Sequence, residues 1–247
     1  MRNEDVLARI HLNAVLSNLE ILAREDAQAL SIAGTWQGSI LLIAGLQGPS
    51  ATLEMKQGAV RVTPGRTGNT GIILFFPTAK MLNNLFTGAG RGFPVPLKGL
   101  FRIKGFKAFA GLAKRMETVL KSADAPRKLK ARLLLNTVGR TVAVLAASEP
   151  ESQKAAFGLR GVAELRIKDS EAVHIIFTEQ GATAGSGRAP NPDLVMEFAS
   201  EDVFLDLTED KVDVFAAICL EDIRIQGDLH MGDIVNRLLD RVGVYLQ

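Results

Sequence analysis

Residues 7–15 read Leu-Ala-Arg-Ile-His-Leu-Asn-Ala-Val, and residues 130–138, which lie 123 positions further along, read Lys-Ala-Arg-Leu-Leu-Leu-Asn-Thr-Val. Five of these nine positions are identical. The same offset pairs Gly38 with Gly161, and an offset of 122 pairs Phe76 with Phe198 and residues 102–105 with residues 224–227. A single match arises by chance, but an ordered series along two nearly equal offsets indicates a tandem duplication. The sequence therefore predicts two similar domains, 1–121 and 122–247, joined near Pro126.

Each repeat carries the same order of local patterns. Apolar residues spaced by three and four predict an opening helix over 3–29 and again over 127–147. Short β-rich runs bounded by glycine follow, at 39–46, 51–56, 59–63 and 72–76 in the first repeat. A short helix (79–86 and 201–207), one more strand (98–104 and 220–226) and a closing helix (106–120 and 229–242) complete each repeat. This order predicts an α+β fold in which a mostly antiparallel five-stranded sheet carries helices on one face.

The second repeat resembles the sterol carrier protein type-2 domain family in three features that occur in the same order. They are the stretch Pro192-Asp193-Leu194-Val195-Met196-Glu197-Phe198, the acid-capped short helix, and the strand that ends in Gly227-Asp228. The first repeat resembles the family in residues 97–105, although Gly71 and Phe106 stand where the family has aspartates. The resemblance covers 35–120 and 159–245. It implies two sterol-carrier-like repeats, each with an apolar cavity between sheet and helices that holds a sterol, fatty acyl or isoprenoid ligand.

Strand alternation and the short helices select the side chains that we expect to line such cavities. The same side chains would also suit an ordinary packed core, so this pattern leaves both alternatives open. The predicted lining residues are Leu74, Phe76, Met81, Leu85, Phe86, Phe101 and Ile103 in the first repeat, and Met196, Phe198, Phe204, Leu205 and Ile223 in the second.

The outer sheet face differs between the repeats. Leu41, Ile43 and Phe75 occupy it in the first repeat, whereas the second has Glu164, Arg166 and Glu197. An apolar outer face needs a cover. We expect that cover to be the 133–147 helix, the other repeat's sheet, or a second chain in a homodimer.

Charge is also divided between the repeats. Residues 1–121 hold 15 basic and 7 acidic side chains (net +8), and residues 122–247 hold 14 and 20 (net −6), which sum to +2. Eleven basic residues lie between Lys98 and Arg132. This stripe is either a solvated face or a transient contact with an anionic membrane. With one Trp, one Tyr and this small net charge, nucleic acid is not an expected partner.

No motif argues for chemistry. One cysteine and three scattered histidines supply too few ligands for a structural zinc site, and no paired acids have catalytic spacing. Cys219 lies in an apolar run and is expected to be buried. We therefore expect a non-enzymatic, cytoplasmic protein without cofactor, metal or catalytic residues, and the resemblance to the sterol carrier family implies that it binds or transports lipid. The alternative is a structural or regulatory interaction protein that kept the fold without the cavity.

Overall fold

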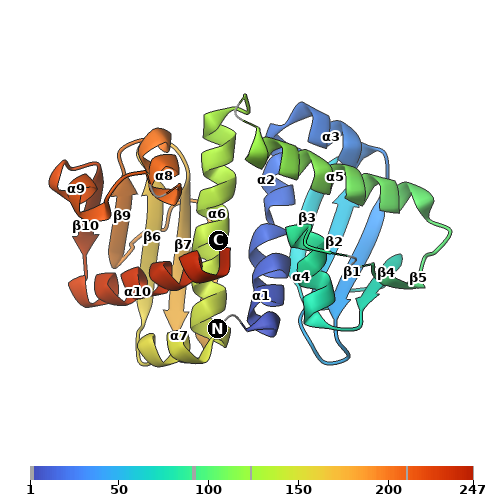
Figure 1. The fold of residues 1–247 in the computed structure, drawn as a ribbon, viewed down its shortest axis with the longest axis horizontal. Coiled ribbons are helices and arrows are strands. Elements are labelled where there is room, and N and C mark those ends of the chain that lie inside the picture. Colours follow the sequence, from blue (N-terminus) through green and yellow to red (C-terminus); the bar gives the residue numbers. More distant parts are fainter. Residues whose placement is uncertain (1–2, 91–92, 123, 210, 247) are drawn as a thin grey trace. The chain divides into compact units, whose positions relative to one another are not determined.

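The computed structural model describes residues 3–90, 93–122, 124–209 and 211–246 of the 247-residue chain. Its contacts divide the chain into two compact units, Met1–Ala125 (unit 1) and Pro126–Gln247 (unit 2). Each unit has one five-stranded sheet and its own set of helices (Figure 1).

In unit 1 the predicted opening helix ends at Glu25, earlier than expected. Asp26 adopts an extended conformation, and its carboxylate accepts a hydrogen bond from the Ala29 backbone N–H (2.8 Å), which caps a separate helix. A π-helical turn interrupts the opening helix at residues 11–15. The elements are α1 (Glu4–Ile10), η1 (His11–Val15), α2 (Asn18–Glu25), α3 (Ala27–Gly34), β1 (Gly38–Ala44), β2 (Ser50–Lys56), β3 (Ala59–Pro64), β4 (Ile72–Phe76), α4 (Ala79–Thr87), β5 (Val95–Lys98) and α5 (Ile103–Lys121).

Unit 2 opens with one uninterrupted helix of 22 residues and contains a short helix, α9, that the sequence pattern did not predict. Its elements are α6 (Arg127–Ser148), α7 (Pro150–Ala155), β6 (Gly161–Ile167), β7 (Ala172–Thr178), β8 (Gly181–Ser186), β9 (Leu194–Phe198), α8 (Glu201–Thr208), α9 (Val214–Cys219), β10 (Ile223–Gly227) and α10 (Leu229–Leu246).

The two sheets have the same topology. The strand orders are β3-β2-β1-β4-β5 and β8-β7-β6-β9-β10. Among the described strand pairs, β1–β4 and β6–β9 are parallel and the others are antiparallel. Even the register agrees, because Ile40 lies opposite Ile72 in unit 1, and Ala163 lies opposite Leu194 in unit 2, at the offsets of 123 and 122. The α+β prediction is confirmed, and the two sheets are consistent with a duplication.

The helices pack on one face of each sheet. The opening helix of each unit covers the β2–β3 or β7–β8 half, and the short helix covers the central strands (Figure 1). Two helical glycines permit close approach: a Cβ on Gly139 would lie 2.4 Å from Val173 Cγ1, and one on Gly105 would lie 2.6 Å from Ile72 Cδ1. Leu42, Leu74 and Phe76 are buried beneath these helices, and for Leu74 and Phe76 this confirms the burial expected from strand alternation.

A crossover segment covers the outer face of the unit 1 sheet. Residues 65–71 connect edge strand β3 to central strand β4, and Thr67 N–H donates to Thr52 Oγ1 (3.1 Å). Thr52 lies opposite Leu41 on this face, and Leu41 and Ile43 are buried. The outer face is therefore apolar, as predicted, but part of its cover is a loop of the same unit, which was not among the expected covers.

The strand predicted at 98–104 is wrong. Strand β5 ends at Lys98, residues 100–101 form a turn, and α5 begins at Ile103. Phe101 and Ile103 consequently lie on the surface, 93% and 60% exposed, instead of facing the core. In unit 2 the corresponding strand is present as β10. Its Ile225 is exposed, although alternation with Ile223 along the strand predicts that it is buried.

Within the described part of the chain, one helical stretch, Glu4–Glu25, is long and apolar enough to cross a membrane. Its most apolar window is 78% buried inside the protein. This burial is typical of a core helix, and its side chains pack against β2, β3 and α4.

Candidate functional site

Seven of the twelve predicted lining residues are buried between sheet and helices. In unit 2, β9 and α8 meet through Phe198 and Phe204, whose rings lie 5.0 Å apart in an edge-to-face arrangement. In unit 1, Met81 and Phe86 on α4 are partly buried, whereas Leu85 is exposed. The buried ones are Leu74, Phe76, Met196, Phe198, Phe204, Leu205 and Ile223.

A buried polar cluster fastens α4 to the opening helix of unit 1. Asn83 Nδ2 donates to the Glu4 carbonyl oxygen (3.0 Å) and to Glu4 Oε2 (2.7 Å). Asn83 Oδ1 is therefore the acceptor that faces His11 Nδ1 at 2.9 Å. The His11 ring also stacks on Phe86, with centroids 4.8 Å apart and planes at 5°.

This cluster determines the proton state of His11. Because the amide oxygen accepts, Nδ1 carries the proton of the neutral imidazole. Burial lowers the pKa of His11 from 6.5 to about 4, and the hydrogen bond to Asn83 and the charge of Glu4 only partly oppose this shift. His11 is consequently neutral at pH 7, and its position in η1, a π-helical turn, places it directly against α4.

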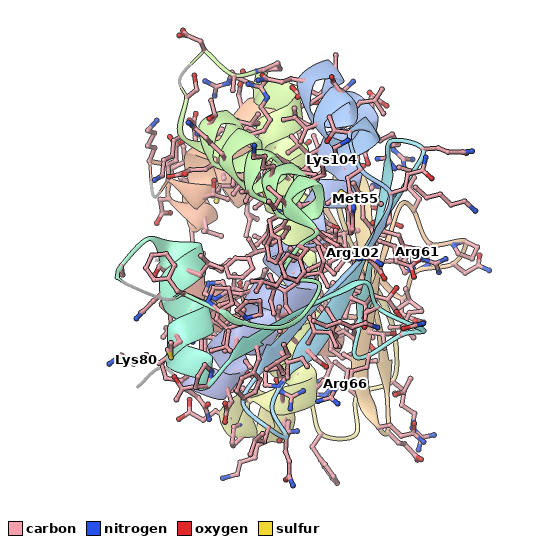
Figure 2. The ribbon with its side chains drawn as sticks, turned by 90° about the vertical axis from the view of Figure 1, so that its right-hand side faces the viewer. Met55, Arg61, Arg66, Lys80, Arg102 and Lys104 are labelled. Carbon is pink, nitrogen blue, oxygen red and sulfur yellow. The ribbon has the colours of Figure 1, made fainter. Side chains whose placement is uncertain are left out.

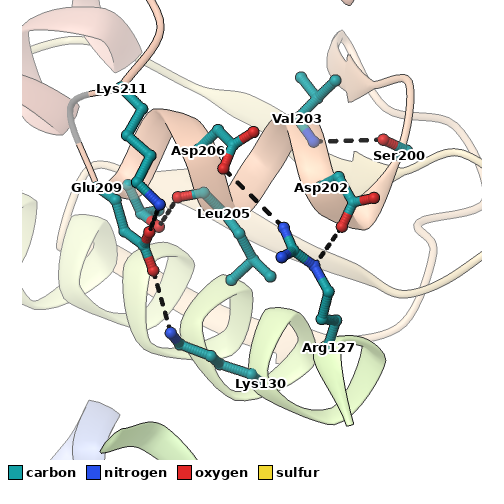
Figure 3. Close-up of polar contacts among 10 residues, drawn as sticks. Arg127, Lys130, Ser200, Asp202, Val203, Leu205, Asp206, Glu209 and Lys211 are labelled. Atoms are coloured by element: carbon teal, nitrogen blue, oxygen red, sulfur yellow. Dashed lines mark hydrogen bonds and ion pairs between the residues drawn. The ribbon is translucent and has the colours of Figure 1, made fainter. Parts of the chain in front are cut away.

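Unit 2 fastens the corresponding helix α8 to α6 with exposed ion pairs instead (Figure 3). Arg127 pairs with Asp202 and lies 4.0 Å from Asp206, and Lys130 Nζ lies 3.1 Å from Glu209 Oε1. Lys130 and Lys211 together lower the pKa of Glu209 to about 2, with Lys211 the stronger influence.

A second tether joins the closing helix to the short helix after the opening one. In unit 1, Arg115 on α5 forms two hydrogen bonds to the Asp26 carboxylate (3.0 and 2.7 Å) and lowers the pKa of Asp26. In unit 2, Arg241 on α10 pairs with buried Glu149 just before α7. The repeat offset of 122 pairs Arg115 with Arg237, which instead pairs with Asp233 on its own helix. In unit 2 the arginine that reaches the matched acid is therefore Arg241, one helical turn after Arg237.

The two aspartates of the family-like motif are structural. Asp193 Oδ2 accepts from the Val162 N–H (2.7 Å) where β6 begins. Asp228 Oδ1 accepts from the His230 N–H (2.8 Å) and caps α10. In unit 1, Gly71 takes the place of Asp193, and a Cβ there would lie 2.8 Å from an Arg102 guanidinium nitrogen.

Exposed apolar side chains gather at the same place in both units, and we call these stretches the unit 1 rim (residues 93–107) and the unit 2 rim (residues 215–229). In unit 1 the strand of the rim, β5, pairs with β4, where Pro96 lies opposite predicted lining residue Leu74. Figure 2 labels the rim residues Arg102 and Lys104 at the entry into α5. The exposed apolar residues are Phe93, Val95, Leu97, Leu100, Phe101 and Ile103 in unit 1, and Phe215, Ile218, Leu220, Ile225 and Leu229 in unit 2.

Cys219 also lies on the unit 2 rim and is exposed, which corrects its predicted burial. Among the described residues, no three His, Cys, Asp or Glu side chains are grouped as a metal ligand set.

A pocket of about 460 Å³ opens elsewhere in unit 2, between α7 and the β7–β8 turn. Phe157, Phe177 and the ion-paired Arg160 and Glu179 line it. None of the predicted lining residues belongs to this pocket.

Comparison with protein families and solved structures gives partial matches. The sequence model of the SCP-2 sterol transfer family matches residues 142–240, a stretch that lies wholly within unit 2. The predicted resemblance is thereby confirmed for this stretch, whereas no such match supports the first repeat, for which it stays a prediction. A comparison with the sequences of curated proteins found no match.

Three solved structures illustrate the likeness. Sterol carrier protein 2 from Yarrowia lipolytica is 17% identical, covers 49% of this chain and 94% of its own, and has a TM-score of 0.35. The sterol carrier protein domain 2 of Helicoverpa armigera is 12% identical over 51% of this chain and 95% of its own, with a TM-score of 0.34. The inverting sec-alkylsulfatase Pisa1 from Pseudomonas sp. is 15% identical over 55% of this chain but only 28% of its own, with a TM-score of 0.31.

Proposed function

We propose that the protein is a non-enzymatic lipid-binding protein that holds an apolar ligand between sheet and helices. The SCP-2 sterol transfer match carries this proposal, because residues 142–240 include β9 and α8 with Met196, Phe198 and Phe204. The ligand is a fatty acyl, sterol-like or isoprenoid molecule, and the protein acts in the cytoplasm.

Binding would be driven by removal of the ligand chain from water. Each buried CH₂ contributes about 0.8 kcal/mol, so a long acyl chain supplies enough free energy without a charged anchor. We expect the short helices α4 and α8 to move, since each lies over predicted lining residues. Polar tethers fasten each of them to the opening helix, in addition to the buried Leu82 of α4 and the buried Phe204 and Leu205 of α8.

The test is native mass spectrometry and lipid extraction of the purified protein, together with displacement of a fluorescent fatty acid. We expect co-purified lipid and saturable displacement. Met196→Trp, which fills the space beside Phe198, should lower probe binding, whereas the exposed Phe157→Ser should not. Absence of both bound lipid and probe binding in the wild-type protein would refute the proposal.

The alternative of an interaction protein relied on the apolar outer face of unit 1 as a binding surface. Leu41 and Ile43 are buried there and Phe75 is half-buried, which favours the lipid-binding proposal over this alternative. The non-enzymatic part of the proposal has its own test, because hydrolysis of secondary alkyl sulfates by the purified protein would contradict it.

A further inference from the structure

We propose that the unit 1 rim docks on anionic lipid bilayers, with Leu100 and Phe101 entering the membrane and the neighbouring cations contacting the headgroups. This docking would not require a bound ligand, so it stands or falls separately from the lipid-carrier function.

The first observation is the shape of the rim. The Arg102 N–H donates to the Gly99 carbonyl oxygen (2.8 Å), which closes a turn with Leu100 and Phe101 at its tip. Turn tips normally carry glycine, proline or small polar residues. Here two large apolar side chains project instead, and Phe101 is 93% exposed.

Gly99 makes this turn possible. Its φ is +82°, and a Cβ at this position would lie 2.5 Å from the Gly71 carbonyl oxygen. The backbone is thus held against β4 while the next two side chains point away from the core. A projecting apolar tip suits a bilayer, which adapts to the inserted side chains without needing a matched pocket.

The second observation is the charge beside the tip. The unit 1 rim has four basic residues and no acid, a net charge of +4: Lys98, Arg102, Lys104 and Lys107. Within the described ranges, no carboxylate forms an ion pair with any of them, and Lys98 Nζ donates a hydrogen bond to the Asn69 amide oxygen (2.9 Å). Cations placed this way favour anionic headgroups, at about 1 kcal/mol each.

Five of the other seven cations of the basic stripe predicted from the sequence are paired, Lys121 with Glu117 among them, whereas no described carboxylate pairs with Lys114 or Lys128. Arg115, Arg127, Lys130 and Arg132 are each engaged with a carboxylate. The membrane contact expected for the stripe from Lys98 to Arg132 is therefore concentrated on its first four cations.

The unit 2 rim supplies an internal comparison. It has the same length and similar apolar exposure, but it carries three acids and one arginine, a net charge of −2. Asp222 and buried Ile223 occupy the positions that match Leu100 and Phe101. An anionic bilayer would repel this rim, so docking should be confined to unit 1.

The experiment is co-sedimentation with vesicles, using equal parts phosphatidylglycerol and phosphatidylcholine against phosphatidylcholine alone. We expect binding to the anionic vesicles that fades as salt shortens the Debye length to about 3 Å at 1 M. Phe101→Ser should weaken binding about tenfold. The matched control is Phe215→Ser, which removes another exposed phenylalanine from the unit 2 rim, and it should bind like the wild-type protein.

Charge has its own pair of variants. Lys104→Glu should weaken binding, whereas Lys168→Glu, which makes the same charge change on the β6–β7 turn, should have little effect. Circular dichroism verifies that each variant is folded. Equal binding to both vesicle types, or equal effects of Phe101→Ser and Phe215→Ser, would overturn the proposal. So would self-association without lipid that Phe101→Ser abolishes, because the rim would then bind a second copy.

Discussion

The buried imidazole of His11 should make unit 1 lose stability in mild acid. In the unfolded chain the imidazole binds a proton near its ordinary pKa of 6.5, whereas burial lowers the pKa in the folded protein to about 4. Between these values the unfolded state holds one more proton, so the free energy of unfolding decreases as pH falls. The difference of about 2.5 pH units, at about 1.36 kcal/mol each, corresponds to a loss of about 3 kcal/mol.

Unit 2 suggests the variant that tests this reasoning. The positions that match His11 and Asn83 are occupied by Leu134 and Leu205. The double variant His11→Leu with Asn83→Leu therefore places in unit 1 the same pair of apolar residues that unit 2 has. Replacing both partners avoids leaving the Asn83 amide buried without its hydrogen-bond partner. The double variant should keep its stability between pH 6.5 and 4 better than the wild-type protein by about 3 kcal/mol.

The assay is urea unfolding followed by tryptophan fluorescence at a series of pH values. Trp36 is the single tryptophan of the chain and packs against Gly38 and Gly105 in unit 1, so its signal reports this unit. Arg115 lowers the pKa of Asp26, so protonation of this carboxylate destabilises unit 1 only below about pH 4. This loss of stability is the same in the wild-type protein and in the double variant. Identical pH profiles for wild-type and double variant would refute the reasoning.

Three further predictions concern unit 2. Gly139→Ala should destabilise it by about 1–3 kcal/mol, because the new Cβ would lie 2.4 Å from Val173 Cγ1, and Trp36 fluorescence should not detect the change. Arg241→Ala should cost about 3–5 kcal/mol in thermal unfolding, because it leaves the Glu149 carboxylate buried without its ion-pair partner. Lys130→Ala should raise amide hydrogen exchange in α8 selectively, and unchanged exchange there would contradict the tether.

Strand alternation predicted most of the fold because it depends on burial alone. Ile72–Phe76 and Leu194–Phe198 have alternating burial on matched positions, and both strands were placed correctly from apolar spacing. The repeat also helped, because an element with a weak pattern in one repeat could be predicted from the matching residues of the other.

The error at the last strand of unit 1 has a physical cause. The sequence offset of 122 matches Arg102 with Arg224 and Ile73 with Val195. In the structure, however, Ile73 on β4 pairs with Lys98 on β5, whereas Val195 on β9 pairs with Gln226 on β10. Lys98 and Gln226 are 128 positions apart, so unit 1 uses an edge strand six residues earlier. An edge strand has one hydrogen-bonded neighbour and tolerates Pro96, so little in its sequence determines the register.

The polar tethers could not be predicted because they join residues that only the fold brings together. Both units have an ion pair between the closing helix and the acid before the following short helix, but the arginine comes from a different position. Arg115 and Arg241 reach the matched acids Asp26 and Glu149 from positions one helical turn apart. A helix presents residues i and i+4 on the same face, so either position places a guanidinium at the same point.

The two short helices carry the same packing role with different chemistry, and this difference has a consequence for their motion. Helix α4 is held by the buried amide and imidazole of Asn83 and His11, which salt does not screen but acid weakens. Helix α8 is held by exposed ion pairs that salt screens, with Glu209 remaining ionised down to about pH 2. Acid therefore weakens the tether of α4, and salt weakens the tether of α8. Any ligand exchange that needs these helices to move is expected to respond to acid in unit 1 and to ionic strength in unit 2.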